Sequence, residues 1–381
     1  MNQMERKQEK PVLVLQGGGA LGAYQAGAYE MLAKAGQTPD WVAGISIGAI
    51  NSAIIAGNRP EERVEKLGRF WGMVSSSLTT RPLAHDDTTR KIFNETSAAL
   101  VASLGIPGFF KPRFPPAVFH PPGSLEAISI YDTAPLRETL QELVDFDLLN
   151  SGKVRLSVGA VQVRTGNMMY FDTARQTITA DHIMASGALP PGFAPIVIDG
   201  EPYWDGGLLS NTPLEYVLEW SGPREDMCIF QIDLFNASGP MPQTLFDIEQ
   251  RAKDIRFSSR TRLNTDVTRR LQTMRRALQR IGAKLPDEVR NSVDWQMLDQ
   301  FSCDAAITVV HLIHRRAAYW TQSTDYEFSR ASIAEHWKAG KADVEHTLQH
   351  PDWIKRQRPE HGVSVLDLTR DIIIPTPEPI E

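Results

Sequence analysis

The 381-residue chain contains little cysteine, since only Cys228 and Cys303 are present. Two cysteines cannot build a disulfide framework. Cys228 also lies in a strand-like apolar run, residues 228–233, where buried structural thiols are common. We therefore expect no disulfide and a reducing compartment.

Long apolar runs are also missing. No stretch approaches the about 20 apolar residues that a membrane-spanning helix needs. The first ten residues carry both signs of charge, and the apolar run that follows, residues 12–15, is too short for the core of a signal peptide. The sequence predicts a soluble, cytoplasmic protein that reaches any lipid from its surface, as a peripheral membrane contact.

Neither sign of charge is in large excess: 40 Lys and Arg stand against 46 Asp and Glu, which gives a formal net charge of −6. This balance argues against a nucleic-acid partner for the whole molecule. Basic side chains nevertheless gather in the helical pattern of residues 251–284. Two interpretations stay open there, namely solvated helix faces packed against an acidic neighbour, or contact with anionic headgroups of a membrane surface.

The chain shows no cluster of His, Cys and Asp at metal-ligand spacing, so the sequence predicts no metal and no cofactor. No internal repeat and no sign of an oligomeric state are visible. The length allows one large α/β domain and an appended unit.

Two glycine-flanked turns, each directly after an apolar run, are the most informative features present. Residues 12–15 are a β-branched and aliphatic run, typical of a strand buried on both faces of a parallel sheet. Residues 41–45 predict a second strand, and residues 24–35 and 49–56 predict the helices that follow the two strands. Both turns then lie at the carboxyl edge of an α/β sheet, where such sheets bind ligands.

The chemistry of the two turns is complementary. The second turn places Ser46 between Gly44 and Gly48, the pattern of a nucleophile elbow. Main-chain amides of the first turn, beside the positive end of the following helix, can bind an oxyanion. Together the turns predict a serine hydrolase with an oxyanion loop formed by Gly17, Gly18, Gly19, Ala20, Leu21 and Gly22.

The first turn has a second interpretation, because Gly17, Gly19 and Gly22 satisfy the dinucleotide-binding pattern G-x-G-x-x-G. That pattern needs an acidic residue at the end of the second strand to bind the ribose. Ile45 and Ser46 stand there instead. The oxyanion interpretation is therefore favoured.

A serine nucleophile needs a base. Asp205 lies in the motif Trp-Asp-Gly-Gly, where the turn at Gly206 and Gly207 can direct its carboxylate into a cleft. The order of an α/β-hydrolase, with the nucleophile followed by Asp or Glu and then His, does not fit a nucleophile on the second strand. Asp205 is therefore favoured over the histidines late in the chain: His311, His314, His336, His346, His350 and His361.

Residues 59–150 form an insertion with few strand-like runs, and their stretch 105–123 is rich in proline and phenylalanine. Two interpretations stay open, a cap over the site or a packed structural excursion. Alkyl chains are stabilised by burial among apolar side chains. The predicted substrate-binding residues are Phe109, Phe110, Phe114, Pro190 and Phe193.

Taken together, these motifs resemble those of the patatin-like phospholipase family, which joins a glycine-rich oxyanion loop, a G-x-S-x-G nucleophile and an Asp-Gly-Gly motif. A further family cue, Ala-Ser followed by a proline-containing stretch, is matched by residues 185–190. The resemblance implies a dyad of Ser46 and Asp205 without histidine. It also implies a three-layer α/β/α fold with a mainly parallel central sheet over residues 10–235.

The activity implied by the resemblance is lipolytic: an esterase or phospholipase A-type hydrolase that releases fatty acid from lipid esters. Many members carry Arg or Lys just before the last glycine of the loop, where this chain has Leu21. Neutral esters and acyl thioesters therefore stay open as substrates beside phospholipids. The alternative function is a catalytically silent lipid-binding or scaffold protein on the same fold.

The last third, residues 236–381, is similar to an uncharacterised domain that some bacterial patatin-like proteins carry. We expect a mostly helical C-terminal extension, with a frayed proline-rich tail from residue 375.

Overall fold

A computed structural model describes residues 9–79, 82, 86–220, 225–259, 261–315, 320–321, 323–360 and 362–369. The predicted frayed tail and His361 lie outside these residues, as do the first eight residues.

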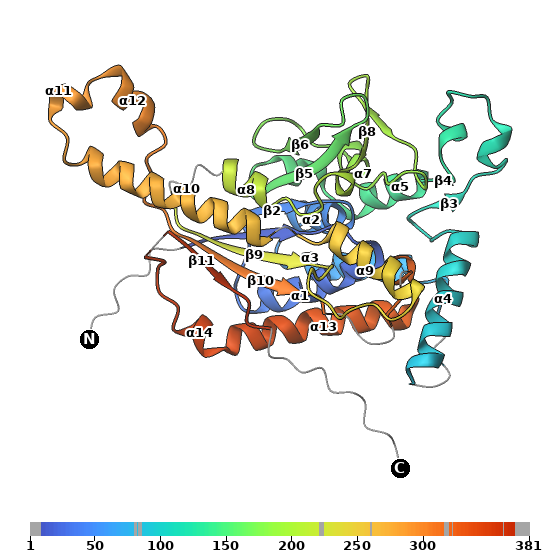
Figure 1. The fold of residues 1–381 in the computed structure, drawn as a ribbon. Coiled ribbons are helices and arrows are strands. Elements are labelled where there is room, and N and C mark those ends of the chain that lie inside the picture. The colour runs from blue at the N-terminus through green and yellow to red at the C-terminus, as the bar shows by residue number, and fades with distance from the viewer. Residues whose placement is uncertain are drawn as a thin grey trace, which may run out of the picture.

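A central sheet of nine strands organises the described residues (Figure 1). The strand order is β11-β10-β9-β1-β2-β5-β8-β7, and β6 pairs with β5. Six strands run parallel: β1 (Lys10–Leu15), β2 (Trp41–Gly44), β5 (Arg155–Gln162), β9 (Met227–Asp233), β10 (Ile307–Ile313) and β11 (Val363–Leu366). Three antiparallel strands complete one side: β6 (Met168–Asp172), β7 (Ile196–Ile198) and β8 (Glu201–Asp205).

The alternation of side chains along β1 produces two apolar cores, one on each face of the sheet. Leu13 and Leu15 pack into the larger core with α1 (Ala23–Lys34), α2 (Ile47–Ala56) and α13 (Arg330–Gln349). Val12 and Val14 point to the opposite face, which α8 (Leu214–Trp220) and α10 (Thr261–Gly282) cover. The predicted three-layer α/β/α fold with a mainly parallel sheet is confirmed.

The insertion at residues 59–150 divides into a packed part and a projecting part. In the packed part, α3 (Arg63–Val74) and α5 (Ala134–Leu143) bury Phe70, Trp71 and Leu136 in the larger core. Residues 113–130 project from the body (Figure 1). The other elements of the insertion are α4 (Asp87–Leu104), β3 (Lys111–Pro112), η2 (Ala117–Phe119), η3 (Glu126–Ile128), β4 (Tyr131–Asp132) and α6 (Phe146–Asn150).

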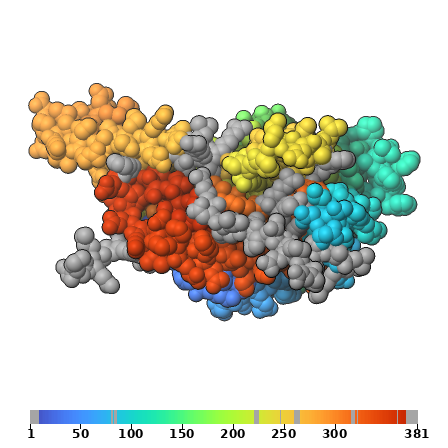
Figure 2. Space-filling model, turned by 60° about the horizontal axis from the view of Figure 1, so that its bottom comes forward, coloured from blue at the N-terminus to red at the C-terminus, as the bar shows by residue number. Residues whose placement is uncertain are grey.

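The last third is helical but not only helical. Its helices include α9 (Leu245–Phe257), α11 (Asp287–Arg290), α12 (Val293–Asp299), η5 (Thr324–Tyr326) and α14 (Pro351–Ile354). Figures 1 and 2 show α10, α11 and α12 reaching away from the body as an arm. Its strands β10 and β11 extend the central sheet beyond β9, so the predicted division near residue 235 does not coincide with a break in the sheet.

Three further observations concern the described residues only. No helix among them is both long and apolar enough to cross a bilayer. Cys228 and Cys303 are both buried and unbridged. No group of three or more His, Cys, Asp or Glu side chains in the described part of the chain could hold a metal ion.

The contact between α1 and α13 joins the first and last thirds of the chain at two glycines. A Cβ on Gly27 would lie 1.9 Å from the carbonyl oxygen of Trp337, and a Cβ on Gly340 would lie 2.0 Å from that of Tyr24. Because carbon and oxygen cannot approach so closely, only glycine lets the two helix backbones pack at this distance.

We expect Gly27→Ala to destabilise the protein by about 1–3 kcal/mol, because the added methyl overpacks the helix contact. Alanine is otherwise preferred over glycine inside a helix by about 1 kcal/mol. The matched control is Gly68→Ala in α3, where a Cβ meets nothing within 4 Å. Urea unfolding should show a loss for Gly27→Ala and a small gain for Gly68→Ala, and equal gains would contradict the close helix contact.

Candidate active site

Ser46 occupies a strained turn between β2 and α2. Its backbone has φ 55° and ψ −123°, a conformation that non-glycine residues rarely adopt. A Cβ on Gly44 would lie 2.3 Å from the carbonyl oxygen of Gly48, and a Cβ on Gly48 would lie 2.3 Å from that of Leu15. The two flanking glycines are therefore required by close backbone packing, as the elbow pattern predicted.

Ser186 anchors the elbow from α7 (Ala180–Ser186). The amide of Ser46 donates to both the carbonyl oxygen and the Oγ of Ser186, at 3.1 and 3.0 Å. The Ser186 hydroxyl in turn donates to the carbonyl oxygen of Gly159 at 2.6 Å. This buried serine of the Ala-Ser cue thus ties the strained turn to β5.

The register of three adjacent strands brings Asp205 to the elbow. Gly44 of β2 pairs with Val158 of β5. Two residues further along β5, Ala160 pairs with Asp205, the last residue of β8. Ser46 lies two residues beyond Gly44, so the serine and the aspartate stand at the same level of the sheet and line one pocket.

Asp205 is a buried residue, only 3% exposed. Burial raises its pKa to about 6, against smaller lowering effects of the Ser46 hydroxyl and the Gly207 amide. The Gly207 amide donates to Oδ1 at 2.7 Å, and a Cβ on Gly206 would lie 2.6 Å from the carbonyl oxygen of Gly159. Gly206 thus allows the turn to approach β5 closely, and the Gly207 amide holds the Asp205 carboxylate in place.

The first three glycines of the predicted oxyanion loop line the pocket with Ser46. The amide of Gly17 donates to the carbonyl oxygen of Asn211 at 3.2 Å. The amides of Gly18 and Gly19 have no acceptor among the residues that the structure describes. The amide of Ile47 has none there either, because it opens α2, whose first N–H groups lack intrahelical partners.

The second half of the predicted loop lies elsewhere. Ala20, Leu21 and Gly22 belong to η1 (Gly19–Gly22) and are buried, and none of them lines the pocket of Ser46. Leu21 instead borders a neighbouring cavity of about 560 Å³. The structure therefore brings Gly17, Gly18 and Gly19 to the pocket, but not the three residues after them.

Asn211 is a site residue that the sequence did not reveal. Its Nδ2 donates to the carbonyl oxygens of Gly17 and Phe257, both at 3.0 Å. A Cβ on Gly17 would lie 2.4 Å from the Asn211 Oδ1. The one sequence signal for Asn211 was its position six residues after Asp205. That signal was not sufficient, because the partners of Asn211 come from distant parts of the chain.

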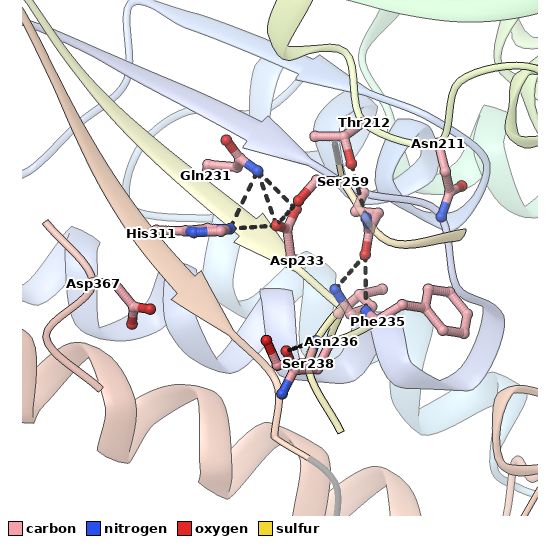
Figure 3. A network of polar contacts seen from close by, with 12 residues as sticks. Asn211, Thr212, Gln231, Asp233, Phe235, Asn236, Ser238, Ser259, His311 and Asp367 are labelled. Atoms are coloured by element: carbon pink, nitrogen blue, oxygen red, sulfur yellow. Dashed lines mark hydrogen bonds and ion pairs between the residues drawn. The ribbon is translucent and has the colours of Figure 1, made fainter. Parts of the chain in front are cut away.

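A polar cluster around Asp233 lies near Asn211 at the same edge of the sheet (Figure 3). The buried Asp233 carboxylate accepts bonds from Gln231 Nε2 at 2.9 and 3.1 Å. His311 Nε2 and Ser259 Oγ also contact Asp233 Oδ2. His311 is therefore engaged with Asp233, away from Ser46.

Histidines do not reach the pocket: none lines it among the described residues. His314 and His336 form a buried pair, with 3.0 Å between Nε2 and Nδ1. His346 and His350 lie at the end of α13. His361 lies outside the described residues.

The pocket has a volume of about 350 Å³. Phe109, Phe110, Pro190 and Phe193 line it, as expected for apolar walls. The three phenylalanines pack against one another with ring centroids 5.3–6.1 Å apart, and Phe70 packs on Phe109 at 6.4 Å. The prediction for Phe114 is wrong, because its side chain is 96% exposed on the projecting residues 113–130.

The fold and the site define a class: a three-layer α/β/α protein with a serine elbow, a buried carboxylate and free main-chain amides at one edge of its sheet. The Patatin-like phospholipase family model matches residues 13–218, and a second model, described as Patatin phospholipase, matches residues 255–360. The chain therefore belongs to the patatin-like phospholipase family, a family of lipid-hydrolysing enzymes.

Two solved structures are similar to the chain. VipD from Legionella pneumophila is 14% identical, with a TM-score of 0.37, over 95% of this chain and 72% of that one. The type III effector protein ExoU is 10% identical, with a TM-score of 0.25, over 87% of this chain and 53% of that one. No curated protein matches the chain.

We expect Asp205→Asn to stabilise the fold at pH 8 by about 2–3 kcal/mol, since a pKa raised from 3.8 to about 6 penalises the ionised carboxylate in the folded state. A raised carboxyl pKa means that stability falls as pH rises from about 4 to about 6. The gain from the uncharged amide should therefore shrink as the pH is lowered through this window. Chemical unfolding of both proteins between pH 4 and 8 measures the difference, and a pH-independent difference would contradict the raised pKa.

Proposed function

We propose that the protein is a serine acyl hydrolase of the lipolytic esterase or phospholipase A type, with Ser46 as nucleophile and Asp205 as base. One observation carries the proposal: a strained, half-buried serine shares a pocket with a buried carboxylate whose pKa is raised to about 6. Such a carboxylate is ionised at neutral pH and remains basic enough to accept a proton. Membership of the family supports lipid esters as the substrate class.

In the acylation step, the Ser46 Oγ attacks the ester carbonyl carbon while Asp205 accepts the hydroxyl proton. The carbonyl oxygen becomes an oxyanion, which the free amides of Gly18, Gly19 and Ile47 stabilise. The bond from the carbonyl carbon to the alcohol oxygen then breaks. The alcohol leaves with the proton from Asp205, and the acyl group stays on Ser46.

In the deacylation step, Asp205 accepts a proton from a water molecule that attacks the acyl carbon. The same amides bind the second oxyanion. The bond between Ser46 Oγ and the acyl carbon breaks, the serine regains its proton from Asp205, and the fatty acid leaves.

The apolar wall of the pocket supports an alkyl chain as the acyl part of the substrate. Each buried CH₂ stabilises the complex by about 0.8 kcal/mol. Leu21 is uncharged and lies outside the pocket of Ser46, so neutral esters and acyl thioesters stay open as substrates beside phospholipids.

The proposed membrane contact of residues 251–284 stays a prediction. Several of their cations have partners within the chain: Arg251 donates to the carbonyl oxygen of Asn236, and Arg276 to that of Pro359. The cytoplasmic location and the absence of a cofactor also stay predictions.

We expect Ser46→Ala and Asp205→Asn each to lower kcat by at least about 10³-fold on a soluble short-chain ester, because positioned base catalysis alone contributes about 10²–10⁴-fold. The matched control is Ser238→Ala, an exposed serine that does not line the pocket of Ser46. Near-normal turnover in either dyad variant would overturn the assignment.

A labelling experiment distinguishes an active hydrolase from a catalytically silent lipid-binding protein. A fluorophosphonate probe should label the wild type at Ser46, because covalent capture needs an activated serine. Binding of fatty-acid esters without labelling or turnover would favour the silent alternative.

We expect Phe193→Ala to shift the preference of the enzyme toward longer acyl chains, because the shortened side chain enlarges the apolar pocket. The control is Phe114→Ala, which changes an exposed ring outside the pocket. Relative kcat/KM values across p-nitrophenyl esters of increasing length measure the profile. Identical profiles for wild type and Phe193→Ala would remove Phe193 from the acyl site.

A further inference from the structure

A segment from the last third of the chain forms part of the catalytic pocket. Residues 324–328, here called the strap, contain η5 and contribute Asp325, Tyr326 and Phe328 to the lining of the pocket of Ser46. The Phe328 ring packs on Phe109, with 6.2 Å between centroids. The strap is almost 280 residues from Ser46 in sequence, and the reaction steps described above do not use it.

The strap contacts the oxyanion loop at its most constrained residue. Gly19 has φ +55°, and a Cβ there would lie 2.2 Å from the carbonyl oxygen of Asp325. The Cα of Gly19 therefore packs directly against the main chain of the strap. Any outward movement of Asp325 would give Gly19 room to turn, and would redirect the free amides of Gly18 and Gly19.

An ion pair with α9 holds the strap in place. Lys253 Nζ bonds to the Asp325 carboxylate, and the two side chains are only 18% and 13% exposed. The same ammonium group lies 4.8 Å from the centroid of the Tyr326 ring. A pair so little exposed is weakly screened by solvent, and removal of one partner leaves a charge without compensation.

The end of α9 contacts the start of the oxyanion loop through two side-chain amides. The carbonyl oxygen of Phe257, one turn after Lys253, accepts bonds from Gln16 Nε2 and Asn211 Nδ2, both at 3.0 Å. Asn211 also binds the carbonyl oxygen of Gly17. One helix of the last third thus reaches the start of the loop through Phe257 and, through Lys253 and the strap, its third glycine. Figure 1 shows α9 lying over the carboxyl edge of the sheet.

We propose that Lys253 and Asp325 are positioning residues of the catalytic site, which hold the strap against Gly19 and so keep the oxyanion amides directed at the reacting carbonyl. This rests on the function proposed above. It gives the last third of the chain a part in the reaction: its α9 and strap complete a site whose nucleophile and base come from the first two thirds.

The test compares Lys253→Met with Lys253→Arg on a soluble short-chain ester. Because small displacements of catalytic groups cost up to about 10²-fold in rate, we expect Lys253→Met to lower kcat by about 10–100-fold with KM changed less than twofold. Lys253→Arg keeps the charge and should restore most of kcat. The matched control is Arg356→Met, which removes the ion pair with Glu9, whose side chains are 17% and 23% exposed, and which should leave kcat unchanged.

A double-mutant cycle identifies the pair as the cause. Asp325→Asn should lower kcat about as much as Lys253→Met, and the double variant should lose no more than either single variant. Additive losses, or a Lys253→Met enzyme with kcat within twofold of wild type, would overturn the proposal.

Hydrogen–deuterium exchange supplies a readout that does not depend on activity. The hydrogen-bonded amides of the loop, those of Gly17 and Leu21, should exchange faster in Lys253→Met than in wild type or Arg356→Met, with unchanged exchange in the sheet. Unchanged exchange in the loop would overturn the role of the ion pair even if the enzyme were inactive. Loss of the proposed function is recognised separately, by turnover that persists in Ser46→Ala.

Discussion

The structure depends on close contact between main chains at the carboxyl edge of the sheet. Gly48 at the start of α2 packs on the carbonyl of Leu15 at the end of β1, and Gly44 packs on Gly48 itself. These contacts push the intervening Ser46 into a backbone conformation that a free peptide would rarely adopt. The strain is balanced by the surrounding fold, in particular by Ser186, which binds the Ser46 amide twice.

The same edge of the sheet buries a carboxylate, that of Asp205, and holds it with a main-chain amide. An ionised carboxylate is disfavoured where Asp205 is buried, and the raised pKa expresses that cost. Among the residues that the structure describes, the Gly207 amide is the one main-chain donor that bonds to this carboxylate, at Oδ1. Additional hydrogen-bond donors would lower the pKa of Asp205 and make its carboxylate a weaker base. The proposed chemistry thus requires a buried Asp205 carboxylate that accepts few hydrogen bonds from the protein.

The last third of the chain is integrated into the molecule by three kinds of contact. Its strands β10 and β11 continue the sheet, its helix α13 packs on α1 at paired glycines, and its α9 and strap border the proposed oxyanion loop. Because the contacts involve the core, the sheet and the pocket together, this third does not behave as an appendage in the structure. The projecting arm of α10–α12 and the exposed residues 113–130 are the parts that extend beyond this common body.

The sequence by itself determined the parallel sheet, the elbow at Ser46, the aspartate turn and four of the five pocket residues. Each of these has a local signal: an apolar run, flanking glycines, a turn motif, or apolar residues near a proline. Phe114 was misassigned because a loop sequence does not reveal which of its aromatic rings turn inward. Only the tertiary structure decided that Asn211, Gln16, the Ile47 amide and the strap meet at the proposed oxyanion loop, and that Ala20, Leu21 and Gly22 lie outside the pocket. The physical reason is that these contacts join segments up to about 300 residues apart, and a local pattern carries no information about the partners that folding brings to it.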